Sequence, residues 1–220
     1  MNTMKALAAA LALLALPALV TPARAAERVK YKPGKTWTLS FEADTLGRPP
    51  VHSLVRGGAW SVEADSTAPG GRVLRQSEDD DGVAFHWIQF ERPFLEDVRV
   101  SVQFRIKSGE IDPTAGLVFQ SDAKGRNGYL VRLTGKSDEV AFHYLLSGRR
   151  RDIQFAKIPA LAPGGWHTLA LEHIGARLRV TYDGAEVLQA REERYARGIV
   201  GLWTEDDTVV DFANLQVGVP

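Results

Sequence analysis

The sequence contains no cysteine among its 220 residues. It therefore has no disulfide to brace the fold and no thiol for the lipid anchor of a bacterial lipoprotein, so its stability must come from an ordinary hydrophobic core. An excess of charge of one sign is also missing, because 27 Lys and Arg residues balance 27 Asp and Glu residues. This balance gives no reason to expect a nucleic acid or an anionic membrane as partner.

Long hydrophobic runs are missing except at the N-terminus. There, Lys5 precedes an apolar run from Ala6 to Val20, and Ala23-Arg24-Ala25 fits the small-x-small pattern of a cleavage site. The alternative is a membrane anchor, but the run is shorter than the ~20 apolar residues that span a bilayer. We therefore expect residues 1–25 to be a signal peptide and residues 26–220 to form one exported domain, periplasmic or secreted, with no membrane contact after cleavage.

Helical periodicity is scarce as well. One short helical turn is predicted over 191–195, whereas the alternation of apolar and polar residues that is typical of β-strands recurs along the chain. Residues 164–184 show a clear hairpin, because alternating strands flank Gly175 and Asp183-Gly184 suits a tight turn. Many short strands separated by turn residues predict one all-β domain. Outside this hairpin, the predicted strands are 37–41, 60–63, 73–76, 83–90, 98–107, 115–120, 129–134, 140–146, 152–156, 186–189, 198–204 and 209–217.

Three stretches resemble a known fold family. They are Gly116–Gln120 with Gly128–Leu133, the hairpin that begins at Gly165-Trp166-His167, and Gly198–Trp203 with Asp211–Val217. Together they resemble the concanavalin A-like lectin/glucanase jelly roll. Within that fold they are most similar to the laminin-G-like modules and to the bacterial 3-keto-disaccharide hydrolase family, often labelled family 16 glycoside hydrolase-like. The resemblance runs from Phe41 to Val217 and implies a two-sheet antiparallel jelly-roll β-sandwich that binds or cleaves sugars on a concave face.

The carboxylate pair of a family 16 glycosidase is missing. Such enzymes carry E-x-D-x-x-E on one strand, because alternate residues point into the same cleft and hydrolysis with retention needs two close carboxyl groups. Glu42-Ala43-Asp44 begins like the motif, but Gly47 stands where the last glutamate belongs. Glu205-Asp206-Asp207 is acidic but comes at the end of a strand. Ordinary family 16 hydrolysis is therefore not expected.

Planar hydrogen-bonding side chains recur where the strands turn away from the core. Guanidinium, amide and imidazole groups bind vicinal hydroxyls, and tryptophan stacks on sugar rings. The alternative is that these residues are simply the polar surface of a half-exposed sheet. The run Arg149-Arg150-Arg151 is interpreted separately, as an exposed hairpin turn. His86 and His143 are also acid–base candidates, because imidazole titrates near neutral pH. The predicted ligand-binding residues are Gln103, Arg105, Arg132, His143, His86 and Trp203.

The resemblance also implies a structural calcium ion. Jelly-roll glucanases commonly place an aspartate just before an aromatic residue on the last strand, and Val210-Asp211-Phe212 matches that position. The other ligands would be backbone carbonyls of the loop from Glu42 to Gly47, since calcium prefers oxygen ligands. The alternative is that Asp211 pairs locally, for example with an arginine.

Three functions are compatible with these features. The first is an exported, lectin-like sandwich that binds a carbohydrate or glycoconjugate on its polar sheet face. The second is an enzyme of the 3-keto-disaccharide hydrolase type, in which a His or Glu near Arg105 would abstract a proton next to the ketone. The third is a laminin-G-like module that binds proteins. If Arg105, Arg132 and His143 converge in one concave pocket with a carboxylate near, the enzyme is favoured. If they spread over an open groove, binding is favoured, and if a loop covers the concave face, both are excluded.

Overall fold

Apolar residues at every second position drive this chain into strands that bury one face. In strand β6 (Val98–Ser108), Val98, Val100, Val102, Phe104 and Ile106 are all buried, as the alternation predicted. The computed structural model describes residues 31–79, 84–162 and 164–220. The predicted signal peptide, residues 1–25, lies outside these residues.

The strands form two antiparallel sheets, which we name sheet A and sheet B. Sheet A has eight strands; β1 (Thr36–Leu39) pairs with β15, and the order of the others is β13 (Ala185–Arg191), β12 (Arg177–Tyr182), β11 (His167–Ile174), β6, β15 (Val209–Gly218), β4 (Arg72–Gln76) and β3 (Trp60–Ala64). Sheet B has seven strands in the order β10 (Arg149–Lys157), β9 (Glu139–Leu146), β8 (Gly128–Thr134), β7 (Thr114–Ser121), β14 (Gly198–Glu205), β5 (Phe85–Leu95) and β2 (Ser53–Val55).

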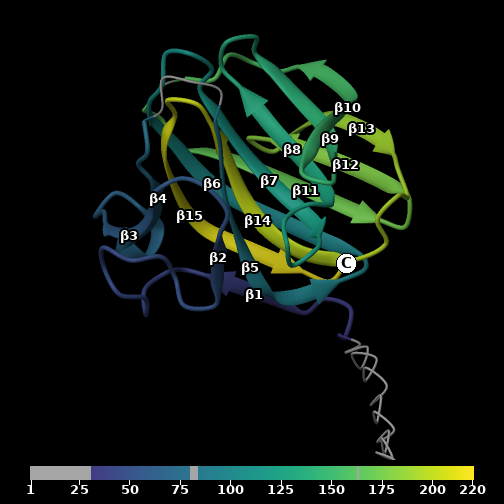
Figure 1. Ribbon diagram of the computed structural model, residues 1–220, viewed down its shortest axis with the longest axis horizontal. Helices are drawn as coiled ribbons and strands as arrows, with labels where there is room; N and C mark the ends of the chain where they lie inside the picture. Colours follow the sequence, from purple (N-terminus) through teal and green to yellow (C-terminus); the bar gives the residue numbers. More distant parts are fainter. Residues whose placement is uncertain (1–30, 80–83, 163) are drawn as a thin grey trace, which may run out of the picture. The chain divides into compact units, whose positions relative to one another are not determined.

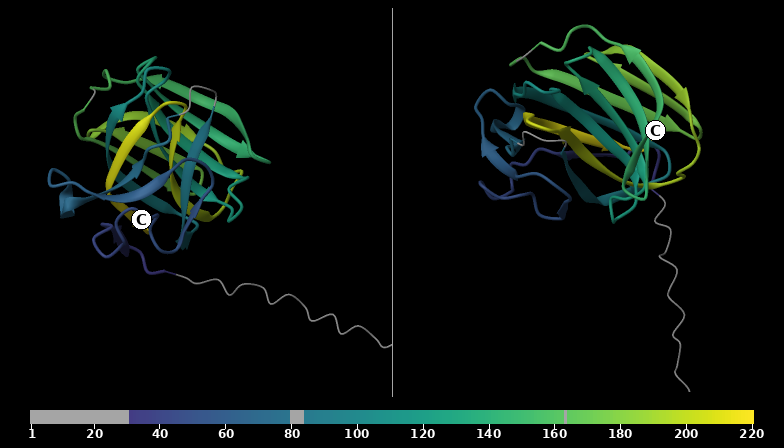
Figure 2. Two further views of the ribbon diagram at one scale, coloured as in Figure 1. Left: turned by 60° about the vertical axis from the view of Figure 1, so that its left-hand side comes forward. Right: turned by 45° about the horizontal axis from the view of Figure 1, so that its top comes forward.

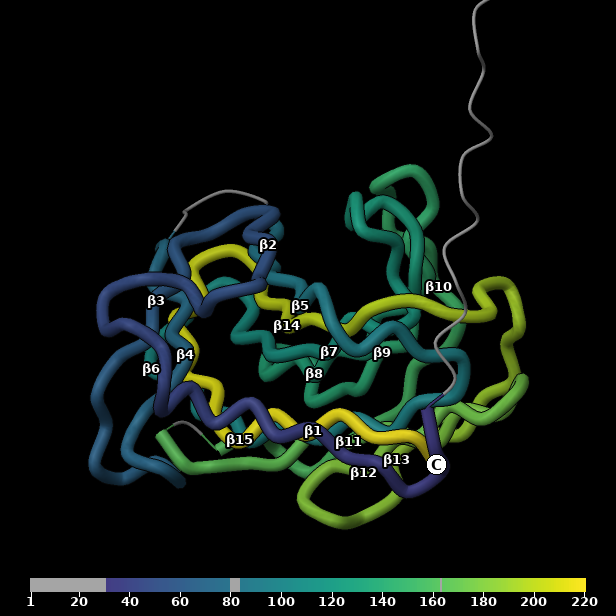
Figure 3. Tube along the Cα trace, turned by 90° about the horizontal axis from the view of Figure 1, so that it is seen from below, coloured from purple at the N-terminus to yellow at the C-terminus, as the bar shows by residue number. Residues whose placement is uncertain are grey.

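The two sheets pack face to face as a sandwich. Figure 1 shows the strands of the two layers crossing, and Figure 2 shows the same layers from two other sides. Seen from below, β5, β14, β7 and β8 lie in one layer, and β15, β11 and β12 lie in the other (Figure 3). This all-β, two-sheet jelly roll is the predicted fold.

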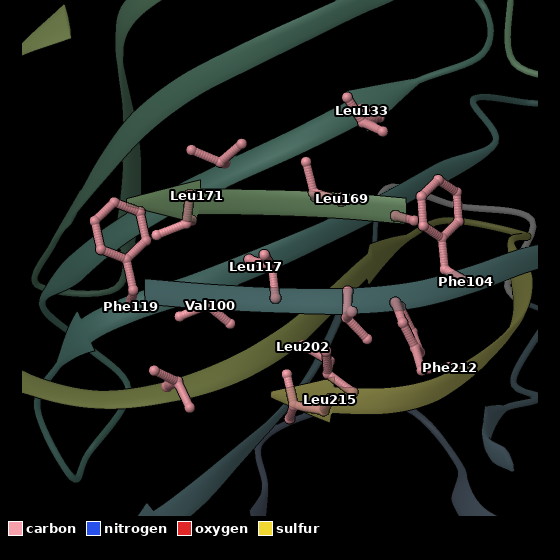
Figure 4. Packing of buried hydrophobic residues seen from close by; sticks show 14 of the residues in the cluster. Val100, Phe104, Leu117, Phe119, Leu133, Leu169, Leu171, Leu202, Phe212 and Leu215 are labelled. Atoms are coloured by element: carbon pink, nitrogen blue, oxygen red, sulfur yellow. The ribbon is translucent and has the colours of Figure 1, made fainter. Parts of the chain in front are cut away.

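The core lies between the sheets. Phe104 and Leu169 of sheet A and Phe119, Leu117 and Leu202 of sheet B, for example, turn their side chains into it, and all five are buried (Figure 4). Burying each such side chain contributes about 1.5–3 kcal/mol to the free energy of folding. With no cysteine in the chain, this apolar layer supplies the stability.

The predicted helical turn at 191–195 is wrong. Strand β13 continues to Arg191, which pairs with Arg177 of β12, and the segment that follows has no helical turn. The Tyr195 backbone N–H donates to the hydroxyl of Tyr129 at 2.9 Å, and the Glu192 side chain accepts from the next two backbone amides. These contacts satisfy the backbone groups that a helix would have paired. The 3-10 turn η1 (Pro69–Gly71) is the helical element of the described residues.

Among the residues that the structure describes, no helix is long and apolar enough to cross a membrane.

Candidate functional site

Charged side chains gather on the outer face of sheet B, the face that points away from the core. In β8, Tyr129, Val131 and Leu133 point into the core, so the alternate residue Arg132 points outward. Its side chain is 10% exposed. Around it lies a group of ionisable residues that we name the Arg132 network; its members are Asp112, Arg132, His143, Arg150, Asp152 and Glu205.

Arg132 is the centre of this network. Its Nη1 donates to Oδ2 of Asp112 at 3.3 Å, and its Nε lies 3.4 Å from Oε1 of Glu205. The same Nε donates to Nε2 of His143 at 3.3 Å. One guanidinium therefore contacts residues from β9, from β14 and from the connection between β6 and β7, so three distant segments are fixed around it.

Glu205, at the end of β14, is the carboxylate on which the donors converge. Its side chain is 5% exposed, and it accepts from Nε1 of Trp203 at 2.8 Å and from Nη1 of Arg150. Arg150 reaches it from the edge strand β10, and its guanidinium lies over the ring of Phe85 at 5.1 Å. Two guanidinium groups thus share one buried carboxylate, and the carboxylate of Asp112, which also pairs with Arg132, balances the second positive charge.

His143 is buried, neutral and held at both ring nitrogens. Burial, together with repulsion from Arg150 and Arg132, lowers the pKa of His143 to about 4. Because Nε2 accepts from Arg132, the proton is on Nδ1, which donates to Oδ1 of Asp152 at 3.0 Å. With both nitrogens engaged, His143 orients Arg132 and Asp152, and neither nitrogen is available as the general base considered from the sequence.

Asp112 supplies an acceptor that no group of the described residues uses. It lies in the connection between β6 and β7, where its backbone carbonyl accepts from the hydroxyls of Thr114 at 2.8 Å and Thr208 at 3.3 Å. One carboxylate oxygen, Oδ2, binds Arg132, whereas Oδ1 is buried and has no partner among the described residues. Buried polar atoms without a partner are rare in folded proteins, so this oxygen calls for a partner such as a water or a ligand hydroxyl.

Aromatic rings lie beside the charged groups. Trp203 stacks on Trp87 with the ring centroids 4.9 Å apart, and Phe85 contacts Trp203 at 5.1 Å. Trp203 itself is only 1% exposed and packs with buried residues such as Leu130. Phe85 and Trp87, which are partly exposed, therefore present the apolar surface, and Trp203 positions the Glu205 carboxylate beneath it.

The structure does not bring all the predicted ligand residues together. Arg132, His143 and Trp203 share the outer face of sheet B. His86 belongs to β5 of the same sheet, but it alternates with Phe85 and Trp87 and so faces the inner side, where its Nε2 lies 3.1 Å from the backbone carbonyl of Asp206.

Gln103 and Arg105 lie on the outer face of sheet A, so the expectation that they share a face with Arg132 is wrong. Their strand, β6, pairs with β11 and β15 of sheet A, whereas β7, the next strand in the chain, joins sheet B. Arg105 donates to Asp211 at 2.8 Å and also to Asp65, and Trp166 lies over its guanidinium at 4.7 Å. Although burial lowers the pKa of Arg105, its hydrogen bonds to these two carboxylates raise it overall.

The predicted calcium ligands do not fit a calcium ion. Asp211 is fully buried, and its two oxygens accept from Arg75 at 2.6 and 3.0 Å as well as from Arg105. The hydrogen bond to Asp211 raises the pKa of Arg75. In the loop expected to complete the site, the backbone carbonyl of Asp44 accepts from Arg72. Guanidinium groups therefore hold the oxygens that a cation would need, and the described part of the chain contains no group of three metal-ligating side chains.

A surface depression of about 400 Å³ lies elsewhere, on the outer face of sheet A. Ser101, Ala170 and Thr181 are among its lining residues, and no aromatic side chain of the described residues lines it. Its arginines are already paired, Arg99 with Glu172 at 3.1 Å and Arg179 with Glu186. The face of sheet B is the stronger candidate, because it combines aromatic surface with a buried, incompletely satisfied charged network.

Several members of this network escaped the sequence reasoning. Glu205 could have been predicted as a neighbour of Trp203, because it follows Trp203 by two residues and therefore lies on the same face of the strand. Arg150 belongs to the run that was interpreted as an exposed turn, yet its side chain reaches across three neighbouring strands to Glu205. Asp112 lies in a connection without periodicity, so nothing in the sequence marks it.

The fold is a jelly-roll β-sandwich of the concanavalin A-like lectin/glucanase type, as the sequence resemblance implied. The chain is similar to the carbohydrate-binding module CBM66 from Bacillus subtilis, with a TM-score of 0.64 and 23% identity over 76% of this chain and 95% of that one. It is also similar to the exoplasmic/lumenal domain of VIP36, with a TM-score of 0.55 and 14% identity over 77% and 90% of the two chains.

Part of the chain is also similar in sequence to a known protein. The chain is 31% identical over 105 residues to a levanase from Bacillus subtilis (strain 168). That match covers 48% of this chain and spans only 15% of the levanase. No family model matches the chain.

Proposed function

We propose that the outer face of sheet B binds a carbohydrate at the Arg132 network. The observation that carries this proposal is the buried Oδ1 of Asp112, which has no partner in the part of the chain that the structure describes and lies on the same carboxylate that Arg132 holds. A sugar with vicinal hydroxyls can donate to this oxygen and accept from the nearby guanidinium, and these charge-assisted hydrogen bonds are strong. The partly exposed rings of Phe85 and Trp87 add an apolar surface for the C–H face of the sugar.

The free-energy cost of burying the charged groups of the network supports recognition rather than stability as its role. Buried ionic groups are often no more stabilising than well-packed hydrophobic residues of the same volume. Arg132 and Glu205 are nevertheless almost fully buried on a face that points away from the core. A fixed set of donors and acceptors, held before the ligand arrives, reduces the ordering cost of binding.

Levan is the first polysaccharide that we propose as ligand. The name of the levanase and the description of CBM66 as a carbohydrate-binding module support this choice. A mannan is the second, because structures of VIP36 include a form bound to Ca²⁺ and Man2. We also propose that the protein meets its ligand outside the cytoplasm, periplasmic or secreted, in keeping with the predicted signal peptide.

The proposal is tested by affinity electrophoresis in gels that contain levan, inulin or mannan. We expect one of these polysaccharides to retard the wild-type protein. Asp112→Asn, which preserves the shape of the side chain, should weaken that binding about tenfold, because it replaces one of the two acceptor oxygens by a donor. Arg132→Ala should abolish the retardation.

The matched control is Arg99→Ala, which removes an arginine paired with Glu172 on sheet A. This variant should bind like the wild type. Melting curves of all variants show whether each is folded. Retardation of folded Asp112→Asn and Arg132→Ala equal to that of the wild type would contradict the proposed site.

A further inference from the structure

An exposed aromatic ring lies beside the Arg132 network on the edge strand of sheet B. Phe155 of β10 is 47% exposed. It is opposite Ala141 of β9, and Ala141 is in turn opposite Arg132 of β8. Directly paired residues share a face, so the three side chains form one row on the outer face of sheet B. Two interstrand spacings, ~10 Å, separate Phe155 from Arg132.

The ring is tied to the network through His143. The imidazole of His143 meets the Phe155 ring at 5.6 Å with an interplanar angle of 85°, an edge-to-face contact. The same imidazole holds Asp152, whose side chain is 68% exposed, through a hydrogen bond of 3.0 Å. An aromatic face and an accessible carboxylate are thus fixed next to each other by one buried, neutral residue.

This arrangement has the chemistry of a sugar subsite. An aromatic face packs against the C–H groups of a sugar ring, and a carboxylate accepts from its hydroxyls. The residue between Phe155 and Arg132 is Ala141, which is fully buried and adds little bulk above the sheet. An exposed phenylalanine on an edge strand is otherwise a liability for aggregation, and its burial by a ligand would remove that liability.

We propose that Phe155, together with Asp152 at the exposed margin of the Arg132 network, forms a second sugar subsite, so that the face of sheet B binds an oligosaccharide chain rather than a single sugar. The inference rests on the proposed function of the Arg132 network. One sugar unit occupies the site at Arg132, and the chain extends over Ala141 so that a further unit lies against Phe155. Affinity must then rise with chain length until the second subsite is filled.

The test measures affinity as a function of chain length by isothermal titration calorimetry with the full chain. The ligands are fructose and levan oligosaccharides of increasing length up to about five units; if the gels select mannan, they are mannose and the corresponding manno-oligosaccharides. We expect the longest oligosaccharide to bind the wild type at least about tenfold more tightly than the monosaccharide, since stacking of a sugar on an aromatic ring contributes on that order.

Phe155→Ala should remove most of this gain and leave the affinity for the monosaccharide unchanged, and Asp152→Asn should reduce the gain in the same direction. Phe94→Ala is the matched control, because Phe94 is 46% exposed and stands near the end of β5, where Arg197 lies over its ring. It should bind both ligands like the wild type.

The outcomes separate the two proposals. Equal affinity of the wild type for monosaccharide and oligosaccharide, or an unchanged gain in Phe155→Ala, would overturn the second subsite while the site at Arg132 stands. Absence of binding to every sugar in the wild type would overturn both proposals.

Discussion

At the scale of single residues, His143 is the most informative side chain. Its imidazole is 1% exposed and contacts Arg132, Asp152 and Phe155. A buried imidazole next to two arginines stays neutral, and only the neutral ring can accept from one neighbour and donate to another. The network is therefore complete only while His143 is unprotonated.

This dependence predicts a loss of stability in mild acid. The pKa of His143 is about 4 in the folded protein against 6.5 ordinarily, so between these values the unfolded chain binds more protons. The stability contribution is complete above pH 6.5 and is lost as the pH falls towards 4. Burial lowers the pKa of His173 as well, which adds a loss in the same window.

The unfolding free energy of the wild type should fall between pH 7 and pH 4.5. In His143→Gln we expect this fall to be about 2 kcal/mol smaller. Urea denaturation of the wild type and the variant at both values measures this difference. Asp65 also loses a stability contribution in acid, because its pKa is lowered from 3.8 to about 2, chiefly by the hydrogen bond from the Thr67 side chain. That loss occurs below the ordinary pKa of 3.8, so the range from pH 7 to pH 4.5 avoids it. A fall of the same size in both proteins would show that His143 is not the titrating group.

At the scale of elements, β14 joins the aromatic surface and the Arg132 network of sheet B. It lies between β5 and β7 and carries both Trp203 and Glu205. Near its middle, Gly201 lies where a Cβ atom would come within 2.3 Å of the backbone carbonyl oxygen of Ile88 in β5. The absence of a side chain at this position lets the neighbouring strand approach.

Gly201→Ala is therefore expected to destabilise the protein by about 2–3 kcal/mol, the usual cost of overpacking a core. Gly135→Ala is the control, because there the nearest heavy atoms would lie at an ordinary 3.5 Å. Chemical denaturation of both variants gives the comparison. Equal stabilities for the two variants would contradict the close approach of β5 and β14.

At the scale of the whole molecule, the two outer faces carry separate ionic networks. Arg105 with Asp65 and Asp211 lies on sheet A, and Arg132 with its carboxylates lies on sheet B, with the apolar core between them. Each network leaves one buried polar atom without a partner among the described residues, Nε of Arg105 on sheet A and Oδ1 of Asp112 on sheet B. The first network holds strands of sheet A and the nearby loop together, and the second lies beside the partly exposed Phe85 and Trp87. We propose that the first serves stability and the second recognition.

This separation predicts independent effects. Arg105→Ala leaves the fully buried Asp211 with one guanidinium fewer and should destabilise the fold by about 3 kcal/mol. Its effect and that of Arg132→Ala should add to within ~0.5 kcal/mol in the double variant, because distant sites without shared partners do not couple. Sugar affinity should change only with Arg132. Strong non-additivity, or weakened binding in Arg105→Ala, would contradict the assignment.

Most of the fold could be predicted from local pattern. The alternation in 98–107 identified both the strand and its buried face, and Asp183-Gly184 indicated the turn between β12 and β13. The short edge strand β2 was missed, because three residues in a proline-rich region carry too little periodicity. The helical turn at 191–195 was wrong because tertiary hydrogen bonds, which a local pattern does not contain, satisfied that segment instead.

The sequence by itself determined which side of each strand faces the core, because side chains alternate with a period of two and apolar residues leave water. It could not decide which outward residues meet. Arg105 and Arg132 have the same outward pattern, yet β6 pairs within sheet A and β8 within sheet B. Only the tertiary structure decided this, since the choice of sheet depends on pairing between segments that are distant in the chain. The same long-range pairing brought Asp112, Arg150 and Glu205 around Arg132 and gave Asp211 arginine partners.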